Sequence, residues 1–148
     1  MHRVLTTDFA ALESISRLRA IEVYGNPKDA DFTTLPNLQL LKLFNIQRQL
    51  DLQFLVDQTE LRFLSISGGF SGLSNVDSLQ TISSLPKLTE LKMLAIRVSA
   101  KSQLRPLETC RSLKKLTLSN TCEPVEYAYL SVHLPRFECD MFAPYVAI

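Results

Sequence analysis

Apolar residues recur along the chain in the pattern L-x-x-L-x-x-L-x-L. The pattern is clearest in residues 35–43, LPNLQLLKL, and in residues 85–93, LPKLTELKM. With the second apolar position of each copy as its anchor, the anchors are Leu18, Leu38, Leu61, Leu88, Leu113 and, in a decayed copy, Phe137. Successive anchors are 20 to 27 residues apart. Repeats of this length are typical of solenoid proteins, in which each copy adds one structural unit.

The end of each copy predicts a short β-strand. Its last three letters alternate apolar, free and apolar, which is the period of a strand with one buried face. We expect Leu41 and Leu43 to point inward and Lys42 outward. A strand this short needs neighbours, and copies that all run in one direction pair as a parallel sheet. The pattern therefore predicts a coil in which every copy contributes one strand.

Two segments between copies, residues 47–59 and 74–85, carry apolar residues at helical spacing. These positions are Leu50, Phe54 and Leu55 in the first segment and Val76, Leu79, Ile82 and Leu85 in the second. Ser74 and Asp77 resemble a capping pair at the start of the second segment. We therefore expect short helices on the outer side of the coil.

Two other segments are predicted to be irregular. Leu104, Leu107 and Cys110 are spaced by three around Pro106, and a proline within such a segment favours a short turn over a long helix. Residues 26–34, NPKDADFTT, are short and polar and are expected to cross as an extended loop.

Five copies in register resemble the repeats of leucine-rich repeat proteins, with matches from about residue 15 to residue 137. The resemblance implies an α/β fold, a solenoid with a curved parallel β-sheet on its concave side and short helices and irregular crossovers on its convex side. We expect residues 1–148 to form one such domain of five to six repeats, with residues 1–14 and 138–148 as terminal caps.

Leucine-rich repeats usually carry an asparagine shortly after the last leucine of the motif, and most copies in this chain lack it. Asn26 occupies that place in the first copy, whereas Ile46, Gly69, Ile96 and Thr121 occupy it in the others. The backbone groups that the asparagine would bind still need partners when they are buried. We expect other groups to satisfy the turns on this edge.

Composition and charge argue against some classes of binding partner. Sixteen basic and fifteen acidic residues give a net charge of +1, so no global field attracts nucleic acid or an anionic membrane. No run of apolar residues is long enough to span a bilayer. Three cysteines are an odd number and suit a reducing compartment. We expect a cytoplasmic protein that binds neither nucleic acid nor a membrane.

Few residues could carry chemistry. Cys122, His133 and an acid, Glu123 or Asp140, could form a nucleophilic set. Cys122, His133 and Cys139 lack the short paired spacing of a zinc site. These residues are explained more simply as core and turn positions. We expect no catalytic, metal or cofactor site, and hence no enzyme.

The strands leave three columns of residues free on the concave face. Tyr24, Leu40, Phe44 and Phe63 gather across the first three strands, and Leu94 extends them. An apolar patch with interspersed charges is typical of a protein-binding surface. The predicted protein-binding residues are Glu22, Tyr24, Leu40, Lys42, Phe44, Phe63, Ser65, Glu90, Lys92 and Leu94.

The resemblance leaves two functions open. The first is a non-catalytic module, a monomer when free, that binds one protein and could be an inhibitor such as an immunity protein that blocks a toxin. The second is a substrate-receptor or scaffold fragment of a larger, F-box-like protein. Residues 110–122, CRSLKKLTLSNTC, resemble the cysteine-containing repeats of F-box ubiquitin ligases, although the second cysteine comes one residue late.

Overall fold

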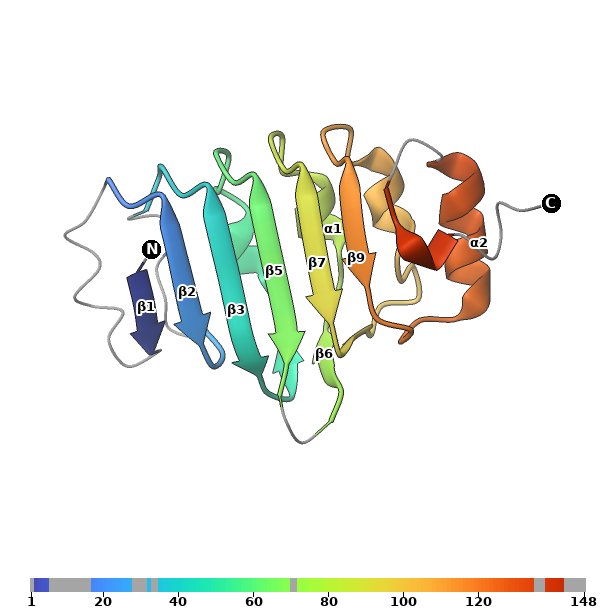
Figure 1. The fold of residues 1–148 in the computed structure, drawn as a ribbon, viewed down its shortest axis with the longest axis horizontal. Helices are drawn as coiled ribbons and strands as arrows, with labels where there is room; N and C mark the ends of the chain where they lie inside the picture. The colour runs from blue at the N-terminus through green and yellow to red at the C-terminus, as the bar shows by residue number, and fades with distance from the viewer. Residues whose placement is uncertain are drawn as a thin grey trace.

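The computed structural model describes residues 2–5, 17–27, 32, 35–69, 72–134 and 138–142, the side chains of residues 2–5 and 140 excepted. These residues form a six-stranded sheet whose strands follow one another in chain order (Figure 1). The strands are β1 (His2–Leu5), β2 (Ala20–Tyr24), β3 (Leu40–Ile46), β5 (Phe63–Gly68), β7 (Glu90–Leu94) and β9 (Lys115–Leu118). All neighbouring pairs are parallel. The predicted coil, with one strand per copy, is confirmed.

The strand register follows the repeat frame. From β2 onward, each strand of this sheet begins two residues after its anchor leucine. Leu41 lies between Ile21 and Leu64, and Leu91 and Leu116 continue the same row. All five side chains are buried. A slip of one residue would turn this row to solvent, so the alternation of apolar residues fixes the register.

The sheet extends beyond the predicted copies at both ends. In β1, His2 pairs with Ile21 and Leu5 with Tyr24, although the letters HRVL contain no leucine motif. At the other end Glu138 forms a parallel bridge with Lys115, where the decayed sixth copy begins a further rung. The remainder of the two expected caps, residue 1 and residues 6–14 and 143–148, lies outside the described residues.

The crossovers contain a second, three-stranded parallel sheet that the sequence did not predict. Its strands are β4 (Gln49–Leu50), β6 (Ser74–Val76) and β8 (Ile96–Val98). The helices expected here are reduced to the 3-10 turn η3 (Leu52–Leu55) and the single turn α1 (Gln80–Ser83). The predicted helix cap at Ser74 is therefore wrong. The spacing of apolar residues alone could not distinguish a helix from a strand in these segments, because Leu50 and Val76 also fit the alternation of a strand.

The last crossovers differ from each other. The short turn predicted around Pro106 is confirmed as the 3-10 helix η4 (Arg105–Thr109). After β9 the chain forms α2 (Pro124–His133), followed by η5 (Asp140–Phe142) (Figure 1). The sequence did not predict α2. Its proline stands in the first turn, where a missing N–H costs nothing, and Tyr127, Leu130 and Leu134 point into the core.

The first crossover is described only in part. Of residues 26–34, the structure describes Asn26, Pro27 and Phe32, so the expected extended loop lies largely outside the described residues. Phe32 is buried and its ring centroid lies 4.9 Å from that of Phe54. Gln58, which interrupts the leucine frame, is 1% exposed, and its Nε2 donates to the carbonyl of Phe32 at 2.7 Å.

Asn26 takes the family position that the sequence assigned to it. Its Nδ2 donates to the carbonyls of Gln47 (2.7 Å) and Gln49 (3.3 Å), and its Oδ1 accepts from the N–H of Gln47 at 2.8 Å. In later copies hydroxyl groups replace the asparagine: Ser74 donates to the carbonyl of Ile46. The hydroxyl of Thr121 donates to the carbonyl of Ile96. The expectation that other groups satisfy these turns is confirmed.

Candidate protein-binding face

The three predicted columns lie on the face of the six-stranded sheet that is turned toward the reader in Figure 1, with α1 behind the strands. The register aligns the first column as Ala20, Leu40, Phe63, Glu90 and Lys115. It aligns the second as Glu22, Lys42, Ser65, Lys92 and Thr117. Neighbouring strands lie about 4.8 Å apart, so members of one column are lateral neighbours. We call this surface the concave face.

The apolar residues of the concave face come from neighbouring strands. Leu40 pairs with Phe63 in the register. Tyr24 and Phe44 are stacked, with ring centroids 5.2 Å apart and an interplanar angle of 25°. The third column is Tyr24, Phe44, Ser67, Leu94 and Ser119. Leu94 extends it from β7. All five apolar side chains are half-buried, because neighbouring side chains cover part of each.

A shift in register interrupts the third column. The pairing of β3 with β5 changes between Leu43 and Ile46. Asn45, in this stretch, has a φ of 55°, which an asparagine adopts more readily than most residues. Beyond the shift, Ile46 pairs with Gly68. Gly68 has no room for a side chain, because a Cβ there would lie 2.5 Å from the carbonyl oxygen of Ala95.

Two of the predicted binding residues are buried, contrary to the expectation that they face solvent. Glu22 is 7% exposed and Ser65 is 4% exposed. Both stand in the middle column, where Ser65 lies between Lys42 and Lys92 in the register. Lys42 Nζ lies 3.4 Å from Glu22 Oε1, so this lysine covers the carboxylate. Glu22 and Ser65 can support the face but offer little surface to a partner.

Glu90 and Lys92 are the charged members of the set on β7, and both are half-buried. Neither makes an ion pair with another residue in the described parts of the chain. Lys92 lies beside Ser65 in the register, and Glu90 lies beside Phe63. Their charges are therefore available to an incoming surface next to the apolar residues.

Among the described residues considered for chemistry, Cys122 and His133 both interact with neighbouring groups of the fold. Burial raises the pKa of the Cys122 thiol, although hydrogen bonds from Tyr127 and Thr121 oppose the shift; a nucleophilic cysteine needs a lowered pKa. His133 stacks on Tyr129, with ring centroids 3.9 Å apart, and its Nδ1 lies 2.8 Å from the Tyr129 carbonyl oxygen.

Tyr127 organises the turn that contains Cys122. Its hydroxyl donates to the carbonyl of Ser119 at 2.7 Å and accepts from the N–H groups of Thr121 and Cys122, each at 3.1 Å. Burial raises the pKa of this hydroxyl, so it stays protonated and able to donate. The hydrogen bonds around Cys122 thus stabilise the turn after β9.

Within the described residues, no group of three or more His, Cys, Asp or Glu side chains is placed to hold a metal ion. No helix in those same ranges is long and apolar enough to cross a membrane.

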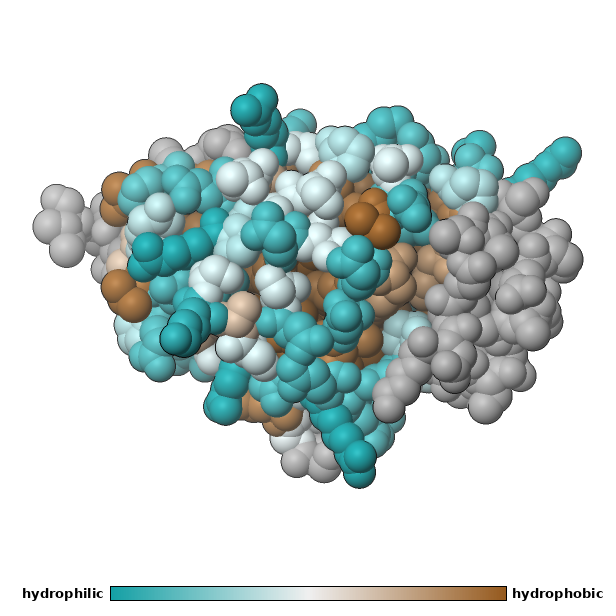
Figure 2. Space-filling model, turned by 180° about the vertical axis from the view of Figure 1, so that it is seen from behind, coloured by the Kyte–Doolittle hydropathy of each residue, from teal (hydrophilic) through white to brown (hydrophobic). Residues whose placement is uncertain are grey.

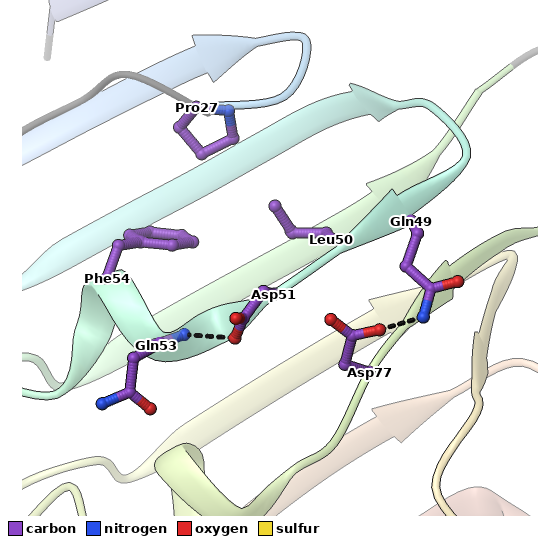
Figure 3. A pocket seen from close by; sticks show the side chains of 7 residues that line it. All are labelled: Pro27, Gln49, Leu50, Asp51, Gln53, Phe54 and Asp77. Atoms are coloured by element: carbon purple, nitrogen blue, oxygen red, sulfur yellow. Dashed lines mark hydrogen bonds between the residues drawn. The ribbon is translucent and has the colours of Figure 1, made fainter.

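The opposite face carries polar side chains over most of its surface, with apolar surface between them (Figure 2). A pocket of about 370 Å³ lies among the crossovers and is lined by the seven residues labelled in Figure 3. Both of its carboxylates are engaged within the fold. Asp51 accepts from the N–H of Gln53 at 2.9 Å as the N-cap of η3, and Asp77 accepts from the side chain of Gln49. The pocket therefore contributes to the crossover structure.

Comparisons with known proteins agree with this architecture. No family model and no curated protein matches the sequence. Among solved structures, internalin C2 from Listeria monocytogenes matches with a TM-score of 0.55 and 22% sequence identity. The match covers 82% of this chain and 52% of the internalin chain, so this chain spans about half the length of that protein.

The chain has the leucine-rich repeat fold. At this level of identity the likeness extends to the fold alone.

Sequence reasoning overlooked one part of the surface of this leucine-rich repeat sheet. The residues directly before β2, β5 and β9 are Arg19, Arg62 and Lys114, all exposed. They form a column one position ahead of the first column. Each of these residues directly precedes a member of the first column, so the repeat frame that predicts the first column also predicts this one.

Proposed function

We propose that this protein is a non-catalytic module that binds one partner protein through the concave face of its sheet and is a monomer when free. The observation that carries the proposal is the gathering of Tyr24, Leu40, Phe44, Phe63 and Leu94 on adjacent strands. Four of the five come from β2, β3 and β5, which are held in register by main-chain hydrogen bonds. A partner would therefore meet a surface that is already ordered.

The energetics of such a surface favour binding. Rigid aromatic side chains supply contact area at a low entropic cost, and a few of them dominate most interfaces. Tyr24 and Phe44 already restrain each other by stacking. Glu90 and Lys92 add charges at the border of the apolar residues, where charge gives specificity more than affinity.

Alanine substitutions test this proposal. Phe44→Ala and Phe63→Ala should each weaken the complex by about 2 kcal/mol or more, which is roughly 30-fold in Kd. The partner is identified as the protein that wild type retains from an extract of the source cells, and the affinities are then measured by calorimetry on the purified pair. Val132→Ala is the matched control, because Val132 is 72% exposed on α2, a helix that packs against η4 and η5 and contributes no residue to the three columns.

Unchanged affinity in both phenylalanine variants would reject the concave face as the binding surface. Loss of affinity in the Val132 control as well would show that the assay reports on folding or on a different face. Circular dichroism of each variant separates loss of structure from loss of contact.

The specific role that we propose is that of an inhibitor, such as an immunity protein, which acts by covering the surface of its partner. A toxin-like reading frame beside the gene, and rescue of growth when both are expressed, would support this role. A substrate-receptor role is the alternative, and it predicts poor solubility of the isolated chain. Light scattering distinguishes the two, because the inhibitor is expected to give a clean monomer.

We place this binding in the cytoplasm. The support is that the sequence contains three cysteines, an odd number, which suits a reducing compartment. Fractionation of the source cells tests this placement.

A further inference from the structure

The residues that immediately precede the strands form a continuous row along one edge of the sheet, the upper edge in Figure 1. Main-chain hydrogen bonds connect its members. The N–H of Gln39 donates to the carbonyl of Arg19, and that of Arg62 to the carbonyl of Gln39, both at 2.8 Å. The N–H of Thr89 donates to Arg62, and that of Lys114 to Thr89, both at 2.9 Å. The order Arg19, Gln39, Arg62, Thr89, Lys114 is therefore fixed by the backbone.

Three of these five residues are cations on alternate rungs. Because neighbouring strands lie about 4.8 Å apart, Arg19, Arg62 and Lys114 are spaced by about 10 Å. All three are exposed. None of them makes an ion pair with another residue of the described ranges. We call these three residues the basic row.

Further cations lie beside the basic row. Exposed residues in the turns that lead into the same strands, or at the first strand position, are Arg17, Lys87, Arg111 and Lys115. Among the residues that the structure describes, the acids along this edge are fewer: Glu60, Glu90 and Glu138. Glu60 is already paired with Lys87, with distances of 2.8 and 2.9 Å. The chain as a whole has a net charge of only +1, so the described part of this edge carries more positive charge than the chain average.

We propose that the basic row docks an acidic border of the same partner whose apolar surface packs on the concave face. This inference rests on the proposed function. Arg62 is followed directly by Phe63, and Gln39 by Leu40, so the row and the apolar column are one residue apart. A partner that covers Leu40 and Phe63 brings its own rim over the row. Carboxylates in that rim would pair with the cations of the basic row. Many protein interfaces have this arrangement, with an apolar centre and a charged border.

The observations favour a protein over a nucleic acid as the occupant. A duplex presents one phosphate for every few ångströms of its length, whereas the cations of the row are about 10 Å apart. The half-buried Leu40 and Phe63 next to the row offer apolar contact that a phosphate backbone cannot use.

The test uses a fluorescent oligoglutamate peptide as the acidic probe and a DNA duplex of equal charge as the competing probe, with binding followed by anisotropy at low salt. The row variant carries Arg19→Glu, Arg62→Glu and Lys114→Glu. The matched control carries Arg48→Glu, Arg97→Glu and Lys101→Glu, which makes the same change in net charge at exposed cations outside the row.

Wild type and the control variant should bind the peptide within about threefold of each other, and the row variant at least about tenfold more weakly. Raising the salt from about 20 mM to about 200 mM should abolish the difference, since exposed charges are then screened. Equal loss in the control variant would overturn the proposal, because attraction would then depend on net charge alone. Tighter binding of the duplex than of the peptide, or no peptide binding by wild type, would overturn it too.

Failure of this inference can be told from failure of the proposed function. Phe44→Ala and Phe63→Ala should leave oligoglutamate binding unchanged while weakening the complex with the partner. With the purified partner, the row variant should slow association by about tenfold with less effect on dissociation. Equal association rates for the row and control variants would count against the row even if the phenylalanine variants behave as expected.

Discussion

Asn26 offers a precise test of how the turns of this solenoid are stabilised. Its amide connects the turn after β2 to the chain that enters β4, through two donated bonds and one accepted bond. The bonds at 2.7 and 2.8 Å to Gln47 have good geometry, whereas the bond of 3.3 Å to Gln49 lies beyond the usual range. A typical bond contributes about 1 kcal/mol net. Asn26→Ala should therefore lower the free energy of unfolding by about 2 kcal/mol.

Urea unfolding followed by circular dichroism measures this loss, provided that the slope of the transition is unchanged. Asn120→Ala is the matched control, because Asn120 occupies the turn after β9, is exposed, and forms no side-chain hydrogen bond with another described residue. Its effect should stay below about 0.5 kcal/mol. Asn26→Asp keeps the shape of the side chain but removes both donated bonds, so this variant should also be less stable than the wild type. A loss below about 0.5 kcal/mol in Asn26→Ala, or full stability in Asn26→Asp, would refute the reasoning.

Three further predictions concern the crossovers. Tyr127→Phe removes a hydroxyl that bonds three backbone groups of the turn after β9, so it should cost about 2 kcal/mol in urea unfolding; a change within experimental error would show that the turn holds without it. Gln58→Leu removes a buried amide oxygen that has no partner, while the carbonyl of Phe32 keeps its bond from the N–H of Leu35. We expect it to raise stability by about 1 kcal/mol, and a loss of the same size would contradict this. Because burial raises the pKa of Cys122, its thiolate should be scarcer at neutral pH than that of a free cysteine. Its alkylation, followed by peptide mass spectrometry, should be slow near pH 7 and accelerate only at alkaline pH, whereas a rate that is already maximal at pH 7 would show an activated thiol.

Much of the six-stranded sheet could be predicted because each copy contains its own information. The alternation around Leu41 and Leu43 sets the strand, and the anchor leucine sets where it begins. Repetition then sets the register, since every copy buries the same positions. The strand β1 carries no such motif, and its pairing depends on the neighbouring β2 edge. Local sequence could not supply that information.

The crossovers were harder to predict because their segments are short and admit two periods. Val76, Leu79 and Ile82 fit a helical face, yet the first belongs to β6 and the last to α1. The choice between strand and helix depends on whether a neighbouring crossover offers a parallel edge, which β4 and β8 do. Tertiary pairing thus overrode local preference.

The positions of the candidate binding residues could be predicted, but their exposure could not. The columns follow from the register, and Leu40 and Phe63 lie together as expected. The burial of Glu22 and Ser65 depends on side-chain packing in three dimensions, as the contact of Lys42 with Glu22 illustrates, and a count along the sequence does not reveal it. The basic row was missed for a different reason. The net charge averages over the chain and conceals a local excess.

Site-specific photo-crosslinking in the source cells tests the role of the concave face most directly. A benzophenone side chain at position 63 replaces Phe63 with another aromatic group on β5, and the same group at position 132 replaces the exposed Val132 on α2. We predict one discrete adduct with a single protein from position 63 and none from position 132. Adducts from position 132 alone, or equal labelling from both positions, would contradict the assignment of partner binding to the concave face.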